Sequence, residues 1–292
     1  MDQSLPMEPS VLITGASTGI GEAGAVELAR RGFRVFAGVR KEADGDRLKA
    51  QSSNIVPLLL DVTDAGQIAA AADAVGRAVG ERGLAGLVNN AGIVVAGPIE
   101  ILPLDVWRRQ LETNVIGQVA VMQAMMPLLR KARGRIVNIS SVNGRIAAPY
   151  MAPYAASKHA LEAISNALRS ELRAWGIRVS IIAPGATSTP IWDKSLAAAN
   201  ALAEQAHQEV FGLYQSDLDA MTSATRELAR TALPVATVVS CIVHALTARH
   251  PRSRYPVGLK VNLLLRAHKW VPDRLWDWLV QRALGLPKIN PP

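Results

Sequence analysis

Six short apolar runs alternate with helix-like segments along most of the chain, and this alternation constrains the fold more than any other feature. The runs are VLIT, RVFAGV, VPLLLDV, GLVNN, RIVNIS and RVSIIA, at residues 11–14, 34–39, 56–62, 86–90, 135–140 and 178–183. A seventh run, RYPVG at 254–258, fits a last strand. Alternating strand and helix signals are typical of β-α-β units, and nearly continuous apolar strands indicate burial on both faces of a sheet. We therefore predict a Rossmann-like, doubly wound parallel sheet of about seven strands with helices on both faces.

The chain of 292 residues is expected to form one continuous domain followed by a short extension. Residues 1–258 contain all of the strand-like runs and no Gly/Ser-rich linker, so we assign them to one domain. Within it, residues 188–232 lose the strand rhythm and become rich in alanine and polar side chains. Insertions at the carboxyl end of such a sheet usually cover the ligand crevice, so we expect this segment to cover a substrate. Residues 259–292 are expected to form a basic, helical C-terminal extension.

Charge and cysteine content exclude several classes of protein. Residues 1–248 carry 23 basic and 22 acidic side chains, while residues 249–292 carry 9 and 2, so seven of the eight excess positive charges lie in the tail. A nucleic-acid surface needs basic residues across one face of the fold, so we expect no nucleic-acid partner. The single cysteine, Cys241, excludes a disulfide framework, and the five histidines lack metal-binding spacing, so we expect no metal.

The hydropathy of the chain indicates a cytoplasmic protein. The N-terminal sequence MDQSLPMEPS has neither the basic nor the apolar region of a signal peptide. No apolar run approaches the length of a membrane span, because Lys260 and Arg266 interrupt the most apolar stretch of the tail.

The first apolar run leads directly into TGASTGIG, residues 14–21, and then into a helix-like segment. Glycines at a turn from a strand to a helix let the backbone approach a pyrophosphate, and the N–H groups at the start of the helix favour an anion. The spacing is G-x-x-x-G-x-G rather than G-x-G-x-x-G, but the position after the first strand is the one that a dinucleotide site requires. The residues expected to contact the cofactor here are Gly15, Ser17, Thr18, Gly19, Ile20 and Gly21.

The end of the second strand indicates which dinucleotide binds. NAD sites use an acidic residue about 20 positions beyond the glycines to hold the ribose 2′-hydroxyl, whereas an arginine accommodates the 2′-phosphate of NADP. Here Val39 is followed by Arg40 and Lys41. We therefore predict NADP(H), with Arg40 at the phosphate; the alternative is that Arg40 is a solvated loop charge.

Polar residues also follow the third, fourth and fifth strands. Because an open α/β sheet binds its ligand at the carboxyl ends of its strands, we expect these residues to line one crevice with Ser141. Asp61 could accept a hydrogen bond from the adenine amino group; the alternative, a cap for the next helix, fits Asp64 better. The expected cofactor contacts are Asp61, Val62, Asn90, Ala91 and Gly92.

A tyrosine and a lysine stand four residues apart in YAASK, residues 154–158. Side chains at i and i+4 share one face of a helix, so Tyr154 and Lys158 can point into the same space. A nearby ammonium favours phenolate, and it would lower the tyrosine pKa from its ordinary value of about 10 toward use as a proton donor or acceptor. Such pairs also occur by chance, so the pair alone does not establish catalysis.

Taken together, these motifs resemble those of the short-chain dehydrogenase/reductase family. The resemblance rests on TGASTGIG at 14–21, NNAG at 89–92, a serine thirteen residues before the tyrosine, YAASK at 154–158 and PGATST at 184–189. It covers about residues 10–258, with the motifs in the order and at the spacing of that family. The resemblance implies hydride transfer between a nicotinamide cofactor and an alcohol or carbonyl.

The resemblance also implies roles for the matched residues. Tyr154 is the expected acid/base at the substrate carbonyl oxygen, and Ser141 would hold that oxygen with its hydroxyl. Lys158 would hold the nicotinamide ribose and lower the phenol pKa, and Asn114 would support the water chain that resupplies the proton. Alternatively, Asn114 bends its helix and Thr189 starts the next one. The residues expected at the nicotinamide carboxamide are Pro184, Gly185, Thr187 and Thr189.

The extension of residues 259–292 favours the branch of the family that contains retinol and hydroxysteroid dehydrogenase-like enzymes, because acyl-carrier-protein reductases usually end near residue 258. We therefore expect a small hydrophobic ketone, aldehyde or alcohol as substrate. The alternatives are a 3-oxoacyl thioester reductase and a non-catalytic, NADP(H)-sensing protein. Relatives are commonly dimers or tetramers, so a homo-oligomer is expected.

The segment WVPDRLWDWLVQRALGL predicts an amphipathic helix with Pro272 in its first turn. Its polar stripe consists of Asp273, Asp277 and Gln281, and its apolar stripe of Leu275, Trp276, Leu279, Val280 and Ala283. A basic, tryptophan-bearing helix of this kind could make a peripheral contact with an anionic membrane surface. Our first expectation is instead that it folds back as a lid over the substrate crevice or forms a subunit contact.

Overall fold

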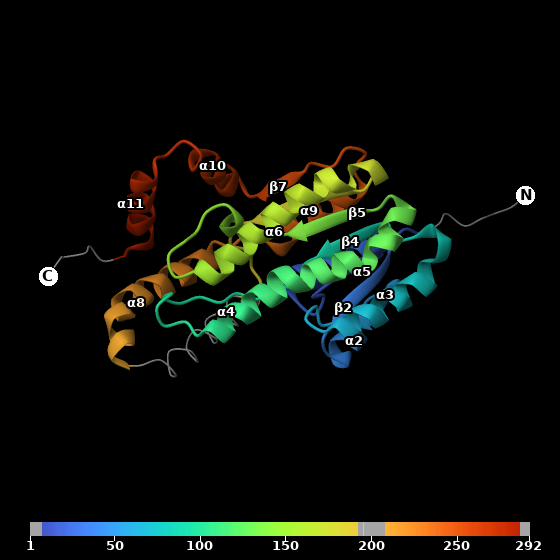
Figure 1. The fold of residues 1–292 in the computed structure, drawn as a ribbon, viewed down its shortest axis with the longest axis horizontal. Helices are drawn as coiled ribbons and strands as arrows, with labels where there is room; N and C mark the ends of the chain where they lie inside the picture. Colours follow the sequence, from blue (N-terminus) through green and yellow to red (C-terminus); the bar gives the residue numbers. More distant parts are fainter. Residues whose placement is uncertain (1–7, 192–194, 196–207, 287–292) are drawn as a thin grey trace, which may run out of the picture.

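The computed structural model describes residues 8–191, 195 and 208–286. One sheet of seven parallel strands has the order β3-β2-β1-β4-β5-β6-β7 (Figure 1). The chain reverses direction across the sheet between β1 and β4, so the predicted doubly wound parallel sheet is confirmed. The strands are β1 Ser10–Ile13, β2 Arg34–Val39, β3 Ile55–Leu59, β4 Gly86–Asn89, β5 Arg135–Ile139, β6 Arg178–Pro184 and β7 Arg254–Val257.

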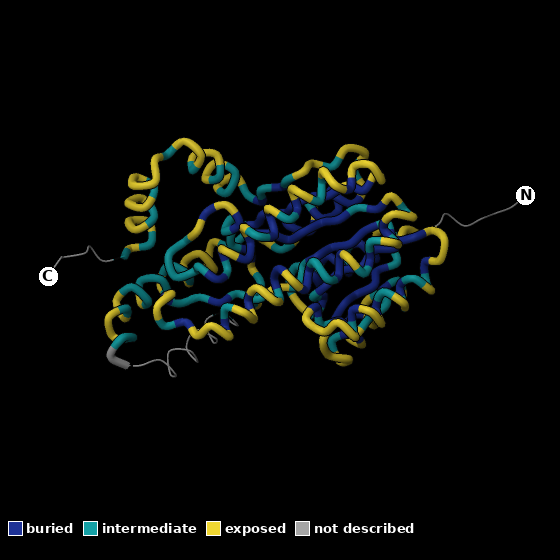
Figure 2. Tube along the Cα trace, in the orientation of Figure 1, coloured by how far each residue is buried: buried dark blue, intermediate teal, exposed yellow. Residues whose placement is uncertain are grey.

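The central strands bury side chains on both faces, as their apolar sequences predict. In β1, Val11 and Ile13 belong to one core cluster and Leu12 to the other, because successive side chains of a strand point to opposite faces. Val137 and Ile136 of β5 divide in the same way. Figure 2 shows these strands as the continuous buried centre of the molecule.

In the described part of the chain, six helices cover the two faces of this sheet. The first cluster includes side chains of α1 (Gly19–Arg30), α2 (Glu42–Lys49) and α9 (Val235–Thr247). The second cluster is covered by α3 (Ala65–Val79), α5 (Gly117–Ala132) and α6 (Ala152–Glu171). Asp64 caps α3 by accepting a hydrogen bond from the backbone N–H of Gln67 at 3.0 Å, so the capping role belongs to Asp64, as expected.

The long helical segment before β5 is interrupted by a π-helical turn at Glu112–Ile116, between α4 (Leu104–Leu111) and α5. Such turns are rare and occur frequently at functional sites. Here the turn contains Asn114, whose side chain is fully buried. Gly117 follows it, and a Cβ there would clash with the carbonyl oxygen of Val62, so this turn packs closely against the end of β3.

The carboxyl ends of the strands point toward α8 (Gln208–Arg230), α10 (Leu259–Ala267) and α11 (Asp273–Leu284), as the arrows of β5 and β7 show in Figure 1. Of the segment expected to cover a substrate, residues 208–230 form α8, and residues 192–194 and 196–207 lie outside the described residues. α8 is therefore the described part of that segment, and its role as a cover stays a prediction.

The C-terminal extension packs on the domain through one edge only. α11 begins at Asp273, so Pro272 is its N-cap rather than part of its first turn as expected. The helix contacts α8, and its Trp276 and Val280 are half-buried. Leu275 and Leu279 of the same predicted apolar stripe are exposed, and no residue of α10 or α11 is buried. The expected burial of the stripe is therefore only partly met. Within the described residues, no helix combines the length and hydropathy needed to cross a membrane.

Candidate active site

The glycine loop joins β1 to α1 at the carboxyl edge of the sheet. Gly15 and Gly19 have φ angles of 64° and 62°, which favour glycine. A Cβ on Gly21 would lie 2.6 Å from Asn90 Nδ2 and would also clash with the Gly15 carbonyl. The side chain of Thr18 makes no capping hydrogen bond, so the first N–H groups of α1 are available for an anion. The loop therefore fits the pyrophosphate of a dinucleotide.

Asn90 and Thr14 fasten this loop to the end of β4. The Asn90 Nδ2 atom donates to the carbonyls of Thr14 and Gly15, each at 3.0 Å. The Thr14 hydroxyl oxygen accepts from the backbone N–H groups of Asn90 and Ala91, also at 3.0 Å each. The predicted residue Asn90 thus lies at the glycine loop. Thr14, which is fully buried, was not predicted, although its place directly before the first glycine is a usable signal.

Asn114 braces the segment after NNAG against α6. Its Oδ1 accepts from the Ile93 N–H at 2.8 Å, and its Nδ2 donates to the Ile93 carbonyl at 3.0 Å and to Ser157 Oγ at 3.1 Å. The Ser157 hydroxyl in turn donates to the Tyr154 carbonyl at 2.7 Å. Gln110 adds a bond to the Ile93 carbonyl at 3.0 Å. Ser157 and Gln110 were not predicted, because no local motif marks them.

Tyr154 and Lys158 share one face of α6, as their spacing predicts. The Lys158 Nζ atom lies 5.8 Å from the centre of the Tyr154 ring. Lys158 is buried, and its Nζ donates to the Ile139 carbonyl at 2.8 Å. Ser141 follows β5 and forms a hydrogen bond with the Tyr154 phenol. The three predicted residues Ser141, Tyr154 and Lys158 are therefore brought together.

Burial controls the protonation of this group. Burial raises the pKa of the Tyr154 phenol, while the hydrogen bond with Ser141 lowers it to a smaller extent. Burial also lowers the pKa of Lys158 from 10.5 to about 8. The expectation that Lys158 lowers the phenol pKa is therefore wrong for this structure, because the ammonium donates to Ile139 and desolvation disfavours phenolate. Tyr154 is a protonated phenol at neutral pH, the form that can donate a proton.

The PGATST segment follows β6 and faces the glycine loop. A Cβ on Gly19 would lie 3.2 Å from the Thr189 methyl group. Thr187 Oγ1 donates to the Gly185 carbonyl at 3.2 Å. Pro184 is the last residue of β6, so its position at the strand end is also as predicted. The predicted nicotinamide-binding segment and the predicted phosphate-binding loop thus lie against each other at the carboxyl edge of the sheet.

The two residues expected at the adenosine lie at the neighbouring strand ends. Arg40 directly follows β2 and is exposed. Asp61 follows β3, and its Oδ1 accepts from the Thr63 N–H at 3.0 Å and from the Thr63 hydroxyl at 2.8 Å, so its other oxygen is the one left for a base. Val62 is buried in the second core cluster, which limits any cofactor contact there to the backbone.

Two tyrosine contacts connect α8 to the segments that precede α4 and α6. Tyr150 lies four residues before Tyr154 and has a φ of 62°. Its phenol O–H donates a hydrogen bond to the carboxylate of Asp217 in α8. Tyr214 of α8 donates to Glu100 at 2.6 Å. The two rings meet edge to face, with centroids 6.4 Å apart. α8 is thus fastened to these two segments by interactions that no sequence pattern indicated.

A buried carboxylate fixes the strand end that carries Ser141. Glu162, on α6 one turn beyond Lys158, is 3% exposed and forms ion pairs with Arg145 at 3.3 Å and with Arg254 of β7. Arg145 directly follows the short helix that Ser141 caps. These contacts fix the position of Ser141 relative to α6, the helix that carries Tyr154 and Lys158.

Comparison with known proteins identifies this arrangement. Residues 9–200 match the family model described as short chain dehydrogenase. Mouse retinol dehydrogenase 5 is 38% identical over 96% of this chain and 92% of the mouse protein. Bovine 17-beta-hydroxysteroid dehydrogenase type 6 is 38% identical over 95% of this chain and 89% of the bovine protein.

Among solved structures, a short chain dehydrogenase from Burkholderia cenocepacia in complex with NADP superposes with a TM-score of 0.71 and 26% identity, covering 96% of this chain and 98% of that one. These similarities support a nicotinamide-dependent oxidoreductase that acts on CH–OH groups. The chain therefore belongs to the short-chain dehydrogenase/reductase family.

Proposed function

We propose that this enzyme is an NADP(H)-dependent oxidoreductase that interconverts an alcohol and a carbonyl on a hydrophobic retinoid-, steroid- or lipid-like substrate. The observation that carries the reaction type is the meeting of Ser141, Tyr154 and the buried Lys158 at the crevice bordered by the glycine loop. The substrate class is supported by the relatives, which are named for retinol and hydroxysteroids and match nearly the whole chain.

The chain's own residues supply the proton and hold the reacting groups. A bound nicotinamide dinucleotide would supply or accept the hydride. During reduction, the Tyr154 phenol donates its proton to the carbonyl oxygen, on which negative charge develops. The Ser141 hydroxyl stabilises the same oxygen, and the Lys158 ammonium would hold the nicotinamide ribose. Asn114 keeps the segment after NNAG against α6 and supports resupply of the proton.

NADPH is expected to be used in preference to NADH, because Arg40 stands at the end of β2 where a 2′-phosphate would be bound. Replacing Arg40 by Ser should lower kcat/KM with NADPH about 10- to 100-fold, since hydrogen bonds to charged groups contribute roughly 1.5–3 kcal/mol. The same change should leave kcat/KM with NADH nearly unaltered. The values of kcat/KM with NADPH and with NADH are measured for the wild type and the variant, with retinal, a ketosteroid, a long-chain aldehyde and a 3-oxoacyl thioester as substrates. Equal use of NADH by the wild type would refute the cofactor assignment, and turnover of the thioester alone would favour an acyl thioester reductase.

The C-terminal extension is proposed to contact an anionic membrane surface. Leu259 and Trp270 are both 87% exposed and Leu263 is 69% exposed, and Figure 2 shows α10 and α11 as largely exposed. Residues 259–286 carry five basic and two acidic side chains, which suits anionic lipid headgroups. Val261 of α10 lies against the crevice, since its methyl is 2.6 Å from where a Cβ on Gly185 would be. A membrane contact here would place the crevice near lipid-dissolved substrates.

The double variant Leu263→Ser, Trp270→Ser should bind vesicles of phosphatidylcholine with phosphatidylserine about tenfold more weakly than the wild type, because it removes two apolar side chains that would enter the interface. Sedimentation with these vesicles measures the effect. Leu59→Ser, which changes an exposed leucine at the edge of the sheet, is the control and should bind like the wild type. No difference between the two variants would argue against this surface.

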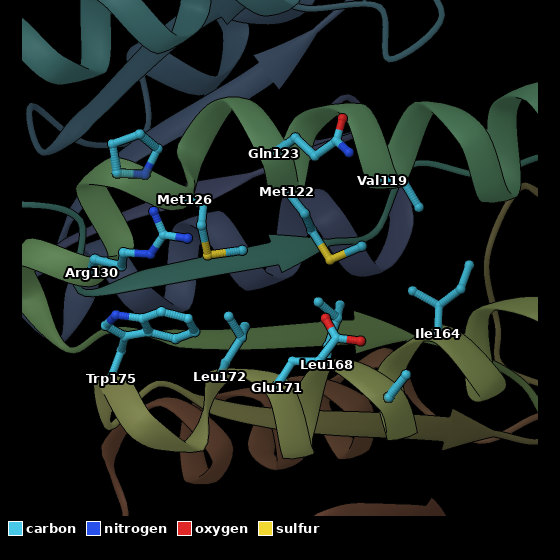
Figure 3. A pocket seen from close by; sticks show the side chains of 12 residues that line it. Val119, Met122, Gln123, Met126, Arg130, Ile164, Leu168, Glu171, Leu172 and Trp175 are labelled. Atoms are coloured by element: carbon cyan, nitrogen blue, oxygen red, sulfur yellow. The ribbon is translucent and has the colours of Figure 1, made fainter.

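A homo-oligomer is proposed, with the groove between α5 and α6 as the subunit contact. The groove has a volume of about 890 Å³ and is lined mainly by apolar side chains of the two helices, which face each other across it (Figure 3). Trp175 is half exposed at one end, with the Arg130 guanidinium 4.8 Å from its ring centre. Arg130 and Glu171 border opposite sides of the groove, so a second copy related by a two-fold axis could pair them reciprocally.

The wild type should therefore be a dimer or tetramer by light scattering at micromolar concentration. Ala167→Glu, which adds a charge in this groove at an exposed position, should shift the protein toward the monomer. Ser170→Glu, exposed on the same helix but outside the groove, is the matched control and should not change the mass. A monomeric wild type would disprove the proposal.

A further inference from the structure

Arg47 lies beside the glycine loop, although no sequence motif indicated a role for it. It is on α2, the helix that follows the second strand. Its Nη1 forms an ion pair with Glu22 in the first turn of α1, and its Nη2 donates to the carbonyl of Ser17 within the loop. Asp44, one turn earlier on α2, lies 3.6 Å from the same guanidinium. Arg47 therefore connects α2 to the loop that borders the adenosine half of the cofactor site.

Arg40 lies in the sequence just after the point where β2 is joined to the same loop. The loop is joined to the end of β2 by a bond from the Ala16 N–H to the Gly38 carbonyl at 2.9 Å, and Arg40 comes two residues later. Within the part of the chain that the structure describes, no acidic side chain forms an ion pair with Arg40. The Arg47 guanidinium is thus neutralised by Glu22, whereas the Arg40 guanidinium pairs with no described carboxylate.

Arg47 can bind a further anion without leaving Glu22. A guanidinium carries five N–H donors, and its contacts with Glu22 and Ser17 use only part of them. Arg47 is 44% and Glu22 28% exposed, so an anion can reach the pair from solvent. The carboxylates of Glu22 and Asp44 would repel such an anion. Their negative charge would therefore lower the affinity of the site for the anion.

We propose that Arg47 is a second guanidinium of the 2′-phosphate site, and that Glu22 holds it in place while weakening phosphate binding through its charge. This inference rests on the proposed preference for NADP(H). It assigns the choice between the two dinucleotides to a pair of arginines and one carboxylate rather than to Arg40 alone.

The test compares dissociation constants for NADPH and NADH, measured by cofactor fluorescence at one ionic strength with purified full-length protein. Arg47→Met should weaken NADPH binding about tenfold and leave NADH binding within a factor of two, because only NADPH carries the phosphate. Glu22→Gln keeps an acceptor for Arg47 but removes the charge, so it should tighten NADPH binding about two- to fivefold. Arg82→Met, an exposed arginine after α3, is the control and should match the wild type.

Two results would overturn the proposal. Equal weakening of NADPH and NADH by Arg47→Met would mean that Arg47 only shapes the glycine loop, and no change in either would mean that it has no part in the site. NADPH binding that Glu22→Gln weakens or leaves unchanged would reject the role of Glu22. The ratio of the NADPH and NADH dissociation constants in the wild type tests the cofactor preference alone. The change of this ratio in Arg47→Met tests the role of Arg47.

Discussion

Replacing Tyr154 by Phe should lower kcat for carbonyl reduction about 10²- to 10⁴-fold, the range expected for loss of a general acid. The change removes one hydroxyl and keeps the ring, so the packing of α6 should persist. Burial keeps this phenol protonated, and the hydroxyl lost is the one bonded to Ser141. The decrease should therefore appear in kcat while the dissociation constant of NADPH stays within a factor of two, as single-turnover rates and cofactor titration can measure.

Tyr150→Phe is the matched control, because it removes a phenol hydroxyl four residues away, in the turn that precedes α6. That hydroxyl donates to Asp217 of α8, so its loss should loosen the cover and raise KM a few-fold with little effect on kcat. Equal losses of kcat in Tyr150→Phe and Tyr154→Phe would show that both act through the cover. Turnover that survives in Tyr154→Phe would remove the phenol from the mechanism.

The fold could be predicted from the sequence because its information is local. A parallel strand buried on both faces must be apolar along its whole length, as VLIT and RVSIIA are, and each such run became a strand of the sheet. The same holds for the pair Tyr154 and Lys158, since helical spacing alone puts both side chains on one face.

The bracing residues could not be predicted because they depend on tertiary contacts. Ser157 and Gln110 meet Asn114 only when α6 packs against the π-helical turn. Glu162 reads in the sequence as an ordinary polar helix residue, yet it is buried against two arginines. The expectation for the Tyr154 pKa failed for the same reason. The i, i+4 spacing indicates that a charged lysine is near, but it does not indicate how strongly burial raises the pKa of the phenol.

The C-terminal extension shows a different limit of sequence patterns. An amphipathic pattern indicates that a helix has an apolar face, but it does not indicate which part of the structure covers that face. In α11, Trp276 and Val280 are half-buried, with the Trp276 ring against His268 of the extension itself, while Trp278 is half exposed and Leu279 is 40% exposed. The apolar stripe is therefore only partly covered, and the sequence pattern did not indicate which part.

Replacing Lys158 by Met should nearly abolish turnover and yet stabilise the cofactor-free protein at neutral pH. The ammonium is buried, and burial lowers its pKa from 10.5 to about 8. This difference of about 2.5 units corresponds to roughly 3 kcal/mol that the folded state loses while the lysine is charged, since one unit is about 1.4 kcal/mol. Methionine fills similar space without a charge but gives up the bond to the Ile139 carbonyl, and a hydrogen bond to a charged group contributes roughly 1.5–3 kcal/mol. The net gain at pH 7 should therefore be at most about 1.5 kcal/mol.

The pH dependence distinguishes this explanation from a simple packing effect. Below pH 8 the lysine is charged in both the folded and the unfolded state, so the folded state carries the full penalty. Between about pH 8 and 10.5 the folded protein has released the proton while the unfolded chain still holds it, so the stability of the wild type rises with pH relative to Lys158→Met. Urea unfolding at pH 7 and pH 10 should therefore show the advantage of the variant shrinking, whereas the exposed control Lys49→Met should show no such change. A variant less stable than the wild type at both pH values would mean that the buried ammonium does not destabilise the fold. The predicted result would mean that this enzyme keeps a destabilising charge because catalysis requires it.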